Sequence, residues 1–237
     1  MIGKHMAFIP AKAKSRRLPS KNLALLGGKP LLFYTLEVAQ QAKIFDKIVV
    51  STDNEQIANL AQKAGAEIPF LRPLELAMDR IKVVDVLYYT LIKMQKELSD
   101  IKTICVLLPT CPLRTVCDIS NTYKIYFESG AYSLVSITDY ELSPYFALEL
   151  DKDGRIKRHF KAEGLEFKSQ FDEVPHLFRP NGAICIIDKL YFLKYKNFYG
   201  DNTVGYFMPR ERSIDIDEPV DLIIAESLLH QSQNFKK

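Results

Sequence analysis

Short apolar segments alternate with amphipathic segments along this chain, and this alternation restricts its fold more than any other feature. The apolar segments are five or six residues long and rich in Ile, Val and Leu, whereas the first amphipathic segment has Leu32, Leu36 and Ala39 at helical spacing. We predict strands at 6–10, 47–51, 68–72, 103–108, 133–137 and 183–187, and helices at 31–42, 55–64, 83–98, 118–129 and 217–229. This order predicts an α/β fold with a parallel or mostly parallel sheet that helices cover on both faces.

The alternation stops after residue 137. Residues 146–150 and 155–160 alternate apolar with charged side chains around an Asp-Lys-Asp-Gly turn, which predicts a β-hairpin, and the polar stretch 162–173 is expected to be an exposed connection. We interpret 140–177 as an excursion from a single domain spanning 1–237, serving as a dimerisation or lid element. An isolated hairpin has too little core to be stable, so we expect a second copy to cover it in a homodimer. The alternative is that the hairpin packs against its own sheet.

Composition excludes several function classes. The net charge is only +3 and the cations cluster locally, so we expect no nucleic-acid partner. No apolar run approaches the length of about 18 residues that crosses a bilayer, and the N-terminus has no apolar leader, so we expect a cytoplasmic protein without a membrane partner. The four cysteines lack CxxC spacing and the four histidines are scattered, which argues against structural zinc. A catalytic metal would therefore be a hard cation with oxygen ligands.

A cationic loop follows the first predicted strand. Residues 11–22 contain five cations, namely Lys12, Lys14, Arg16, Arg17 and Lys21. Open α/β sheets bind ligands at the carboxyl ends of their strands, and five positive charges there require a polyanion, of which a nucleoside triphosphate is the obvious candidate. An isolated basic run is more often a solvated surface. The position of this run, together with a proline and an asparagine that order it, favours binding.

Two carboxylates stand two residues apart near the C-terminus, in the segment Ser-Ile-Asp-Ile-Asp-Glu-Pro at 213–219. Alternation along a strand would place Asp215 and Asp217 on one face. Such a pair can share a divalent cation, or one carboxylate can bind metal while the other accepts a proton. The alternative is that Asp217 caps the following helix, but capping does not explain Asp215.

Three further loops begin or end at predicted strands. They are 71–77, which contains Arg72, 107–114, which contains Arg114, and 178–183. Prolines stiffen each loop, as a binding loop requires. Taken singly, the two arginines are typical of surface or ion-pair residues.

Five motifs in order resemble those of the acylneuraminate cytidylyltransferases, the CMP-sialic acid synthetases, from about residue 7 to residue 229. They are Pro-Ala followed by Ser-Arg-Arg-Leu-Pro-Ser-Lys-Asn (10–22), Ser-Thr-Asp (51–53), Leu-Arg-Pro-Leu-Glu-Leu-Ala (71–77), Pro-Thr-Cys-Pro-Leu-Arg (109–114), and Phe-Arg-Pro-Asn-Gly (178–182) with Ser-Ile-Asp-Ile-Asp (213–217). Each motif alone is weak, whereas their order and spacing are specific.

The resemblance implies a three-layer, mostly parallel, Rossmann-like nucleotidyltransferase sheet with a small β-hairpin dimerisation excursion. It also implies an enzyme that joins CTP to the anomeric hydroxyl of a nine-carbon sugar acid and releases pyrophosphate with Mg²⁺. By position, the catalytic residues would be Lys21, Asp215 and Asp217, with Asp217 the principal Mg²⁺ ligand and Asp215 its helper. The CTP-binding residues would be Ala11, Lys12, Ser15, Arg16, Lys21, Asn22 and Arg72, and the sugar-binding residues Leu108, Arg179 and Asn181.

The chain departs from the family pattern at several positions. Lys12 replaces the usual arginine, the next two residues replace glycines, Leu108 stands where sialic-acid members often have glutamine, and Cys185 replaces a common tyrosine. The arginine that such members carry shortly before Phe178 is not evident. The nucleotide half therefore matches better than the sugar half, and the sequence does not name the sugar. The alternatives are a nucleotidyltransferase of this fold with another acceptor or NTP, and a non-catalytic nucleotide-binding module.

Overall fold

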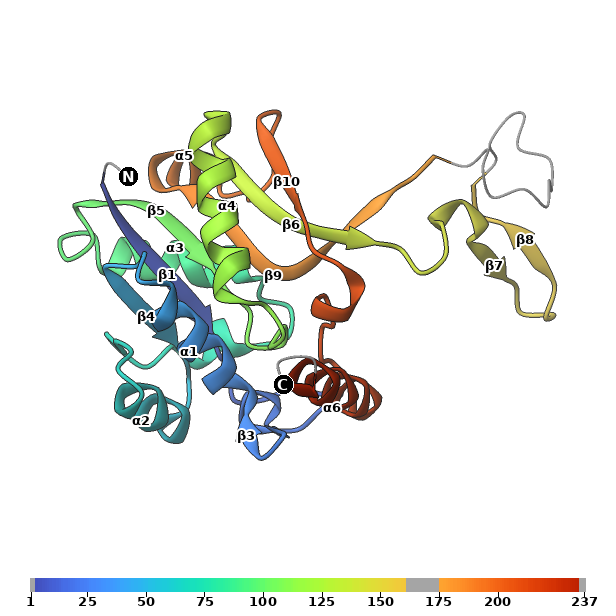
Figure 1. Ribbon diagram of the computed structural model, residues 1–237, viewed down its shortest axis with the longest axis horizontal. Coiled ribbons are helices and arrows are strands. Elements are labelled where there is room, and N and C mark those ends of the chain that lie inside the picture. The colour runs from blue at the N-terminus through green and yellow to red at the C-terminus, as the bar shows by residue number, and fades with distance from the viewer. Residues whose placement is uncertain (1–2, 161–174, 235–237) are drawn as a thin grey trace.

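A six-stranded sheet forms the centre of the computed structural model, which describes residues 3–160 and 175–234 (Figure 1). The strands are β1 (Lys4–Pro10), β4 (Lys47–Ser51), β5 (Ile101–Val106), β6 (Ser133–Asp139), β9 (Phe178–Asp188) and β10 (Thr203–Phe207), in the spatial order β10-β6-β9-β5-β1-β4. β1 pairs in parallel with β4 and β5, and β10 with β6, whereas β9 is antiparallel to both its neighbours. The predicted mostly parallel sheet is confirmed.

Helices cover both faces of this sheet. The helices α1 (Leu31–Ala42), α2 (Glu55–Lys63) and α4 (Val116–Ser129) pack on one face, and α3 (Val83–Lys93) and α5 (Lys189–Tyr195) on the other. Strand β1 supplies both interfaces, because Ala7 and Ile9 face the first set of helices while Met6 and Phe8 face the second. The predicted three layers are confirmed.

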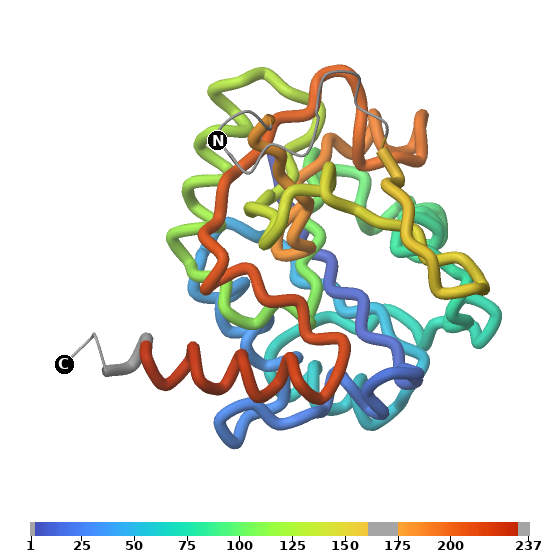
Figure 2. The backbone as a smooth tube through the Cα atoms, turned by 90° about the vertical axis from the view of Figure 1, so that its right-hand side faces the viewer, coloured from blue at the N-terminus to red at the C-terminus, as the bar shows by residue number. Residues whose placement is uncertain are grey.

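The C-terminal helix α6 (Pro219–Asn234) lies outside these layers, beside the N-terminal part of the chain (Figure 2). It packs over a small cluster that includes Leu18, Leu26 and Ala225. The remaining elements are the short strands β2 (Leu25–Leu26), β3 (Lys29–Pro30), β7 (Leu148–Leu150) and β8 (Ile156–Arg158), and the 3-10 helices η1 (Lys21–Leu23), η2 (Leu74–Ala77), η3 (Pro144–Phe146) and η5 (Arg210–Arg212). None of the helices in the described ranges is long and apolar enough to cross a membrane.

Some predicted elements are wrong or misplaced. Residues 68–72 form no strand, since only a single bridge joins Glu67 to Val49, and prolines at 69 and 73 interrupt the ladder. Helix α3 ends at Lys93 rather than near 98. The predicted helix was too long because the turns that follow α3 still bury Met94 and Leu98, so the apolar spacing continues past its end. The elements α5 and β10 were not predicted.

The excursion leaves the sheet where β6 ends at Asp139 and returns where β9 begins at Phe178. The predicted hairpin is confirmed as β7 paired with β8, although it is shorter than expected. It stands away from the sheet (Figure 1), and Leu150 and Ile156 are 71% and 67% exposed. The alternative in which the hairpin packs against its own sheet is therefore wrong. The polar stretch 162–173 lies outside the described residues.

Candidate functional site

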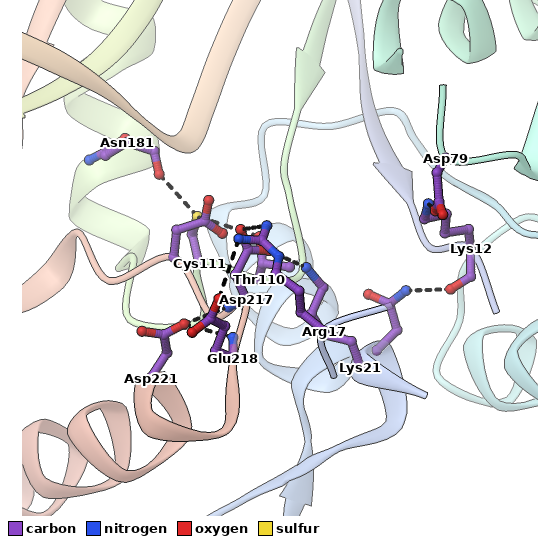
Figure 3. Close-up of polar contacts among 12 residues, drawn as sticks. Lys12, Arg17, Lys21, Asp79, Thr110, Cys111, Asn181, Asp217, Glu218 and Asp221 are labelled. Carbon is purple, nitrogen blue, oxygen red and sulfur yellow. Dashed lines mark hydrogen bonds and ion pairs between the residues drawn. The ribbon is translucent and has the colours of Figure 1, made fainter. Parts of the chain in front are cut away.

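The loops selected from the sequence converge at one edge of the sheet. The loops after β1, β4 and β5 leave from the carboxyl ends of parallel strands, and the start of β9 reaches the same edge because that strand runs in the opposite direction. Backbone hydrogen bonds tie the loops together, from Ala11 N to Ser51 O (2.9 Å) and from Ile216 N to Thr110 O (2.8 Å). The second of these bonds brings the carboxylate segment to the loop after β5 (Figure 3).

Two cavities meet at this edge. The first, of about 230 Å³, has a largely apolar wall and is lined by Pro10, Lys12, Lys21, Asn22, Arg72, Leu76, Met78, Ile81, Val83, Val86, Leu108, Pro109, Thr110, Asp215 and Asp217. The second, of about 420 Å³, is lined by charged and polar residues, namely Lys12, Ser15, Arg16, Arg17, Lys21, Asp79 and Asp217. Both are lined by Lys12, Lys21 and Asp217. An apolar compartment therefore continues into a cationic one.

Asp217 lies where the two cavities join. Lys21 Nζ is 2.7 Å from its Oδ1, and the Arg17 guanidinium contacts its Oδ2. Although partial burial opposes the effect, the hydrogen bond and charge of Lys21, with the charge of Arg17, lower the pKa of Asp217. The carboxylate is therefore held in its anionic form.

Asp217 does not cap α6. The backbone N–H groups of Asp217 and Glu218 instead donate to Oδ2 of Asp221, at 2.9 and 2.7 Å, so Asp221 reaches back to close the first turn. The capping alternative is wrong, and the Asp217 carboxylate faces the cavities, where it contacts Lys21 and Arg17 instead.

Asp215 does not lie in a strand, because residues 213–217 have no regular secondary structure and lie outside the sheet. The residue reaches solvent, but its carboxyl lies against Thr110 and Cys111, with Cys111 Sγ 3.8 Å from Oδ1. Burial of the carboxyl raises its pKa and the charge of Asp217 adds to this, while a hydrogen bond with Thr110 opposes the rise. The two carboxylates are thus near enough to influence each other electrostatically.

The carboxylate pair fits one kind of metal site. Within the described ranges, no group of three or more His, Cys, Asp or Glu side chains could hold a metal ion. Mg²⁺ commonly binds through one or two carboxylates plus substrate phosphates and water rather than in an all-protein cage. Asp217, which lines both cavities, and Asp215, which lines the apolar one, match a metal that arrives with a polyphosphate.

Internal hydrogen bonds order the cationic loop. The side-chain amide of Asn22 donates to the carbonyl of Lys12 (2.8 Å), and Ala13 N donates to Asp53 Oδ1 (2.8 Å). Ser20 adopts a left-handed backbone conformation, with φ of 51°, directly before η1. The structure thus brings the predicted residues of the loop together, with Ser15 in the wall of the cationic cavity.

Arg72 and Arg114 are buried, not surface residues, being 5% and 2% exposed. Arg72 Nε donates to Ser51 Oγ (3.2 Å) and its Nη2 to Ser51 O, and burial lowers its pKa to about 10. Arg114 donates to Thr35 Oγ1 (3.0 Å) and to the carbonyl of Leu108. Arg72 lines the apolar cavity, whereas Arg114 supports the loop after β5 from behind.

The predicted sugar-binding residues are placed differently from one another. Leu108 lines the apolar cavity, but Arg179 is paired with Thr138 in the sheet and lines neither cavity as described. Asn181 is 2% exposed; its side-chain NH₂ donates to Ser213 Oγ (2.9 Å) and its Oδ1 accepts from Ser136 Oγ (2.6 Å). The side chain of Asn181 therefore joins β6, β9 and the carboxylate segment behind the cavity.

Sequence reasoning does not select three residues that the structure places in the site. Thr110 and Cys111 belong to a quoted motif, so their proximity to Asp215 could have been suspected from the motif order. Asp79 carries no local signal. It accepts hydrogen bonds from Lys12 (2.6 Å) and Arg16, which lower its pKa to about 2.

Comparison with known proteins identifies the family. A family model described as cytidylyltransferase matches residues 6–204. The chain belongs to the cytidylyltransferase family. The predicted resemblance is confirmed by relatives that include the CMP-N,N'-diacetyllegionaminic acid synthase of Legionella pneumophila, 34% identical over 96% of this chain and 97% of the relative. The Escherichia coli N-acylneuraminate cytidylyltransferase is 32% identical, and this cytidylyltransferase chain aligns over its whole length with only 54% of that relative.

Solved structures agree with the fold of this cytidylyltransferase. A CMP:2-keto-3-deoxy-manno-octonic acid synthetase complexed with CTP superposes with a TM-score of 0.70 at 15% identity, covering 97% of this chain and 99% of the other. At that identity the likeness concerns the fold alone. The predicted Rossmann-like nucleotidyltransferase architecture is confirmed.

Proposed function

We propose that this protein couples CTP to the anomeric hydroxyl of a sialic-acid-like nonulosonic acid, giving the CMP-sugar and pyrophosphate. The observation that carries the proposal is the apolar cavity that continues into a cationic one at Lys12, Lys21 and Asp217, which suits a nucleoside joined to a triphosphate. The names of the relatives support it, since they include a CMP-N,N'-diacetyllegionaminic acid synthase, an N-acylneuraminate cytidylyltransferase and a pseudaminic acid cytidylyltransferase.

The residues of the site would act by positioning and charge neutralisation, which dominate phosphoryl-type transfer. CMP transfer with release of pyrophosphate requires the sugar hydroxyl to attack the α-phosphorus, breaking its bond to the β-phosphate oxygen. Lys12, Arg16 and Lys21 would neutralise the phosphates, with Ser15 and the backbone of Ala11 beside them. Asn22 and Arg72 would contact the cytidine, since both line the apolar cavity.

We also propose Mg²⁺ as the cofactor, held by Asp217 with Asp215 as its helper. When bound, the metal would stabilise negative charge that develops on the phosphates. Asp217 would then replace its contacts with Lys21 and Arg17 by a contact with the metal, and these two cations would be available to bind the phosphates. Asp215, whose carboxyl has a raised pKa, would bind the metal or accept the proton of the sugar hydroxyl.

The sugar site and the assembly complete the proposal. Leu108, Arg179 and Asn181 remain the predicted sugar-binding residues, and the particular nonulosonic acid is open. We propose a homodimer in which the partner's excursion helps to wall the sugar site, because the hairpin exposes Leu148, Leu150 and Ile156 away from its own sheet. We place the protein in the cytoplasm, where CTP is available.

The test is pyrophosphate release with Mg²⁺, each of the four NTPs and a panel of nine-carbon sugar acids. We expect turnover with CTP and at least one member of the panel, and none with sugar or CTP omitted. Turnover with another NTP or acceptor would favour a different nucleotidyltransferase of this fold. Binding of CTP without turnover on any acceptor would favour a non-catalytic nucleotide-binding module.

A further inference from the structure

Two carboxylates occupy four cations of the cationic loop in this structure. Asp217 contacts Arg17 and Lys21. Under the metal proposal, it would give up both contacts when the nucleotide binds. Asp79 contacts the other two, with its Oδ1 2.6 Å from Lys12 Nζ and its Oδ2 against Arg16 Nε (Figure 3 labels Lys12 and Asp79). The described cavity is therefore already supplied with internal anions where phosphates are proposed to bind.

Asp79 comes from the opposite wall of the site. It follows η2 and precedes α3, and its neighbours Met78 and Ile81 line the apolar cavity. A backbone bond from Ile81 N to Met78 O (3.1 Å) turns the chain at this point. The two contacts of Asp79 thus join this wall to the cationic loop across the charged cavity that both line.

We propose that Asp79 is an internal place-holder for a phosphate group, which holds Lys12 and Arg16 until a nucleoside triphosphate displaces it. Carboxylate and phosphate oxygens accept hydrogen bonds from the same ammonium and guanidinium donors. Because these donors contact Asp79 already, triphosphate oxygens can take them only by breaking these contacts. This inference rests on the proposed binding of a nucleotide.

The place-holder has two opposite consequences. When no ligand is bound, Asp79 holds Lys12 and Arg16 together in an exposed loop, in which the Arg16 side chain is 79% exposed. It also subtracts from nucleotide affinity, and it returns to the same cations when pyrophosphate leaves, which favours product release. A residue that instead aids nucleotide binding, by aligning the cations or by ligating metal, would change affinity in the other direction.

The experiment measures calorimetric binding of tripolyphosphate, CTP and cytidine, with EDTA present so that metal plays no part. Exposed ion pairs are weak, so we expect Asp79→Asn to bind tripolyphosphate and CTP about three- to tenfold more tightly. Cytidine affinity should not change, because cytidine lacks the phosphates. Asp79→Glu, which keeps the charge, should bind like the unchanged protein.

The matched control is Glu75→Gln, which removes the same charge from an exposed position four residues earlier on the same wall. It should leave tripolyphosphate affinity unchanged. Arg16→Ala should reduce the gain from Asp79→Asn, because one of the two displaced contacts is then already absent. Thermal unfolding should show that the variants remain folded.

Equal or weaker tripolyphosphate binding in Asp79→Asn would overturn the proposal, as would an equal gain in Glu75→Gln. Failure of the proposed function looks different. If neither cytidine nor CTP binds the unchanged protein and no NTP turns over, the proposed function fails. The tripolyphosphate affinities of the unchanged protein and Asp79→Asn would still show whether Asp79 competes with an anion.

Discussion

Asp215 and Asp217 have the same side chain but different surroundings, and this difference separates their roles. Asp217 lies between two cations that lower its pKa, whereas the carboxyl of Asp215 lies against Thr110 and Cys111, where burial raises its pKa. A carboxylate kept anionic is the better metal ligand, and one with a raised pKa is the better proton acceptor. The two residues are therefore not interchangeable.

We expect Asp217→Ala to abolish turnover with little loss of stability, because its contacts are with partly exposed cations and such pairs contribute little to stability. Asp215→Asn should be severe but less complete. Initial rates of pyrophosphate release, together with thermal unfolding, measure both. Glu218→Ala is the control: this adjacent carboxylate lies 3.8 Å from Arg17 and lines neither described cavity, so the variant should keep most activity. Normal turnover in Asp217→Ala would disprove its metal role.

Asn181 is expected to matter first for stability. Its amide joins Ser136 to Ser213, and it is 2% exposed. Asn181→Ala leaves these buried hydroxyl groups with fewer partners, so we expect the free energy of unfolding to fall by about 2 kcal/mol. Urea titration checks this. A KM for sugar that rises with no change in stability would instead support direct contact with the sugar.

At the scale of elements, the start of α6 determines where Asp217 lies. Asp221 accepts the backbone N–H of Asp217 and of Glu218 from the third position of the helix. We expect Asp221→Ala to lower the free energy of unfolding by about 1 kcal/mol and to lower kcat by loosening the Asp217 backbone. Asp221→Asn retains an acceptor oxygen, so its unfolding free energy and kcat should lie between those of the unchanged protein and those of Asp221→Ala. Unchanged kcat in Asp221→Ala would mean that the cap does not position Asp217.

The hairpin β7–β8 is the element without a core of its own. Its apolar side chains, among them Leu150 and Ile156, are exposed to water in the single chain. Burying them against a second copy would remove the unfavourable free energy of that exposure. We expect sedimentation at micromolar concentration to give twice the 27.2 kDa of one chain. Replacing 147–159 by a short Gly-Ser linker should give a folded monomer. A single-chain mass for the unchanged protein, with or without ligands, would rule out the dimer.

At the scale of the whole molecule, the sheet buries a titratable group far from the site. His5 is 3% exposed in β1, with Nδ1 2.8 Å from Thr103 Oγ1, and its ring packs against Tyr123 and Phe127. Burial lowers the pKa of His5 below its usual 6.5, although the charge of Asp46 opposes this. The folded protein therefore holds this histidine neutral at pH values where the unfolded chain is protonated.

Stability should consequently fall as the pH is lowered below about 6.5, because the unfolded state then binds a proton that the folded state does not. Above that pH His5 is neutral in both states and contributes no pH dependence. We expect the urea midpoint to fall between pH 7 and pH 5, and to fall less in His5→Gln. The exposed His230→Gln is the control and should behave like the unchanged protein. An equal loss in His5→Gln would assign the pH dependence to other groups.

Local sequence patterns predict most of the elements and the order of the motifs. The strand 47–51 and the helix 31–42 are found at their predicted bounds, and β1 differs by two residues, since apolar periodicity records which face of a segment is buried. The edge strand β10 escaped prediction, because none of its five residues is fully buried and Gly205 interrupts its apolar run, so the segment lacks that signal. The cationic loop and the carboxylate pair could be assigned to one site only through the family resemblance, because no local pattern joins them.

Which residues meet within that site depends on tertiary packing, and no sequence pattern predicts it. Asp79 lies 67 positions from Lys12, and Lys21 lies 196 positions from Asp217, so no local pattern records either contact. The same holds for the burial of Arg72 and Arg114 and for the separation of the hairpin from its own sheet. Periodicity shows that a side chain is buried or exposed within its own element. The neighbours across the site depend on how distant elements pack, and that packing is set by the whole chain at once.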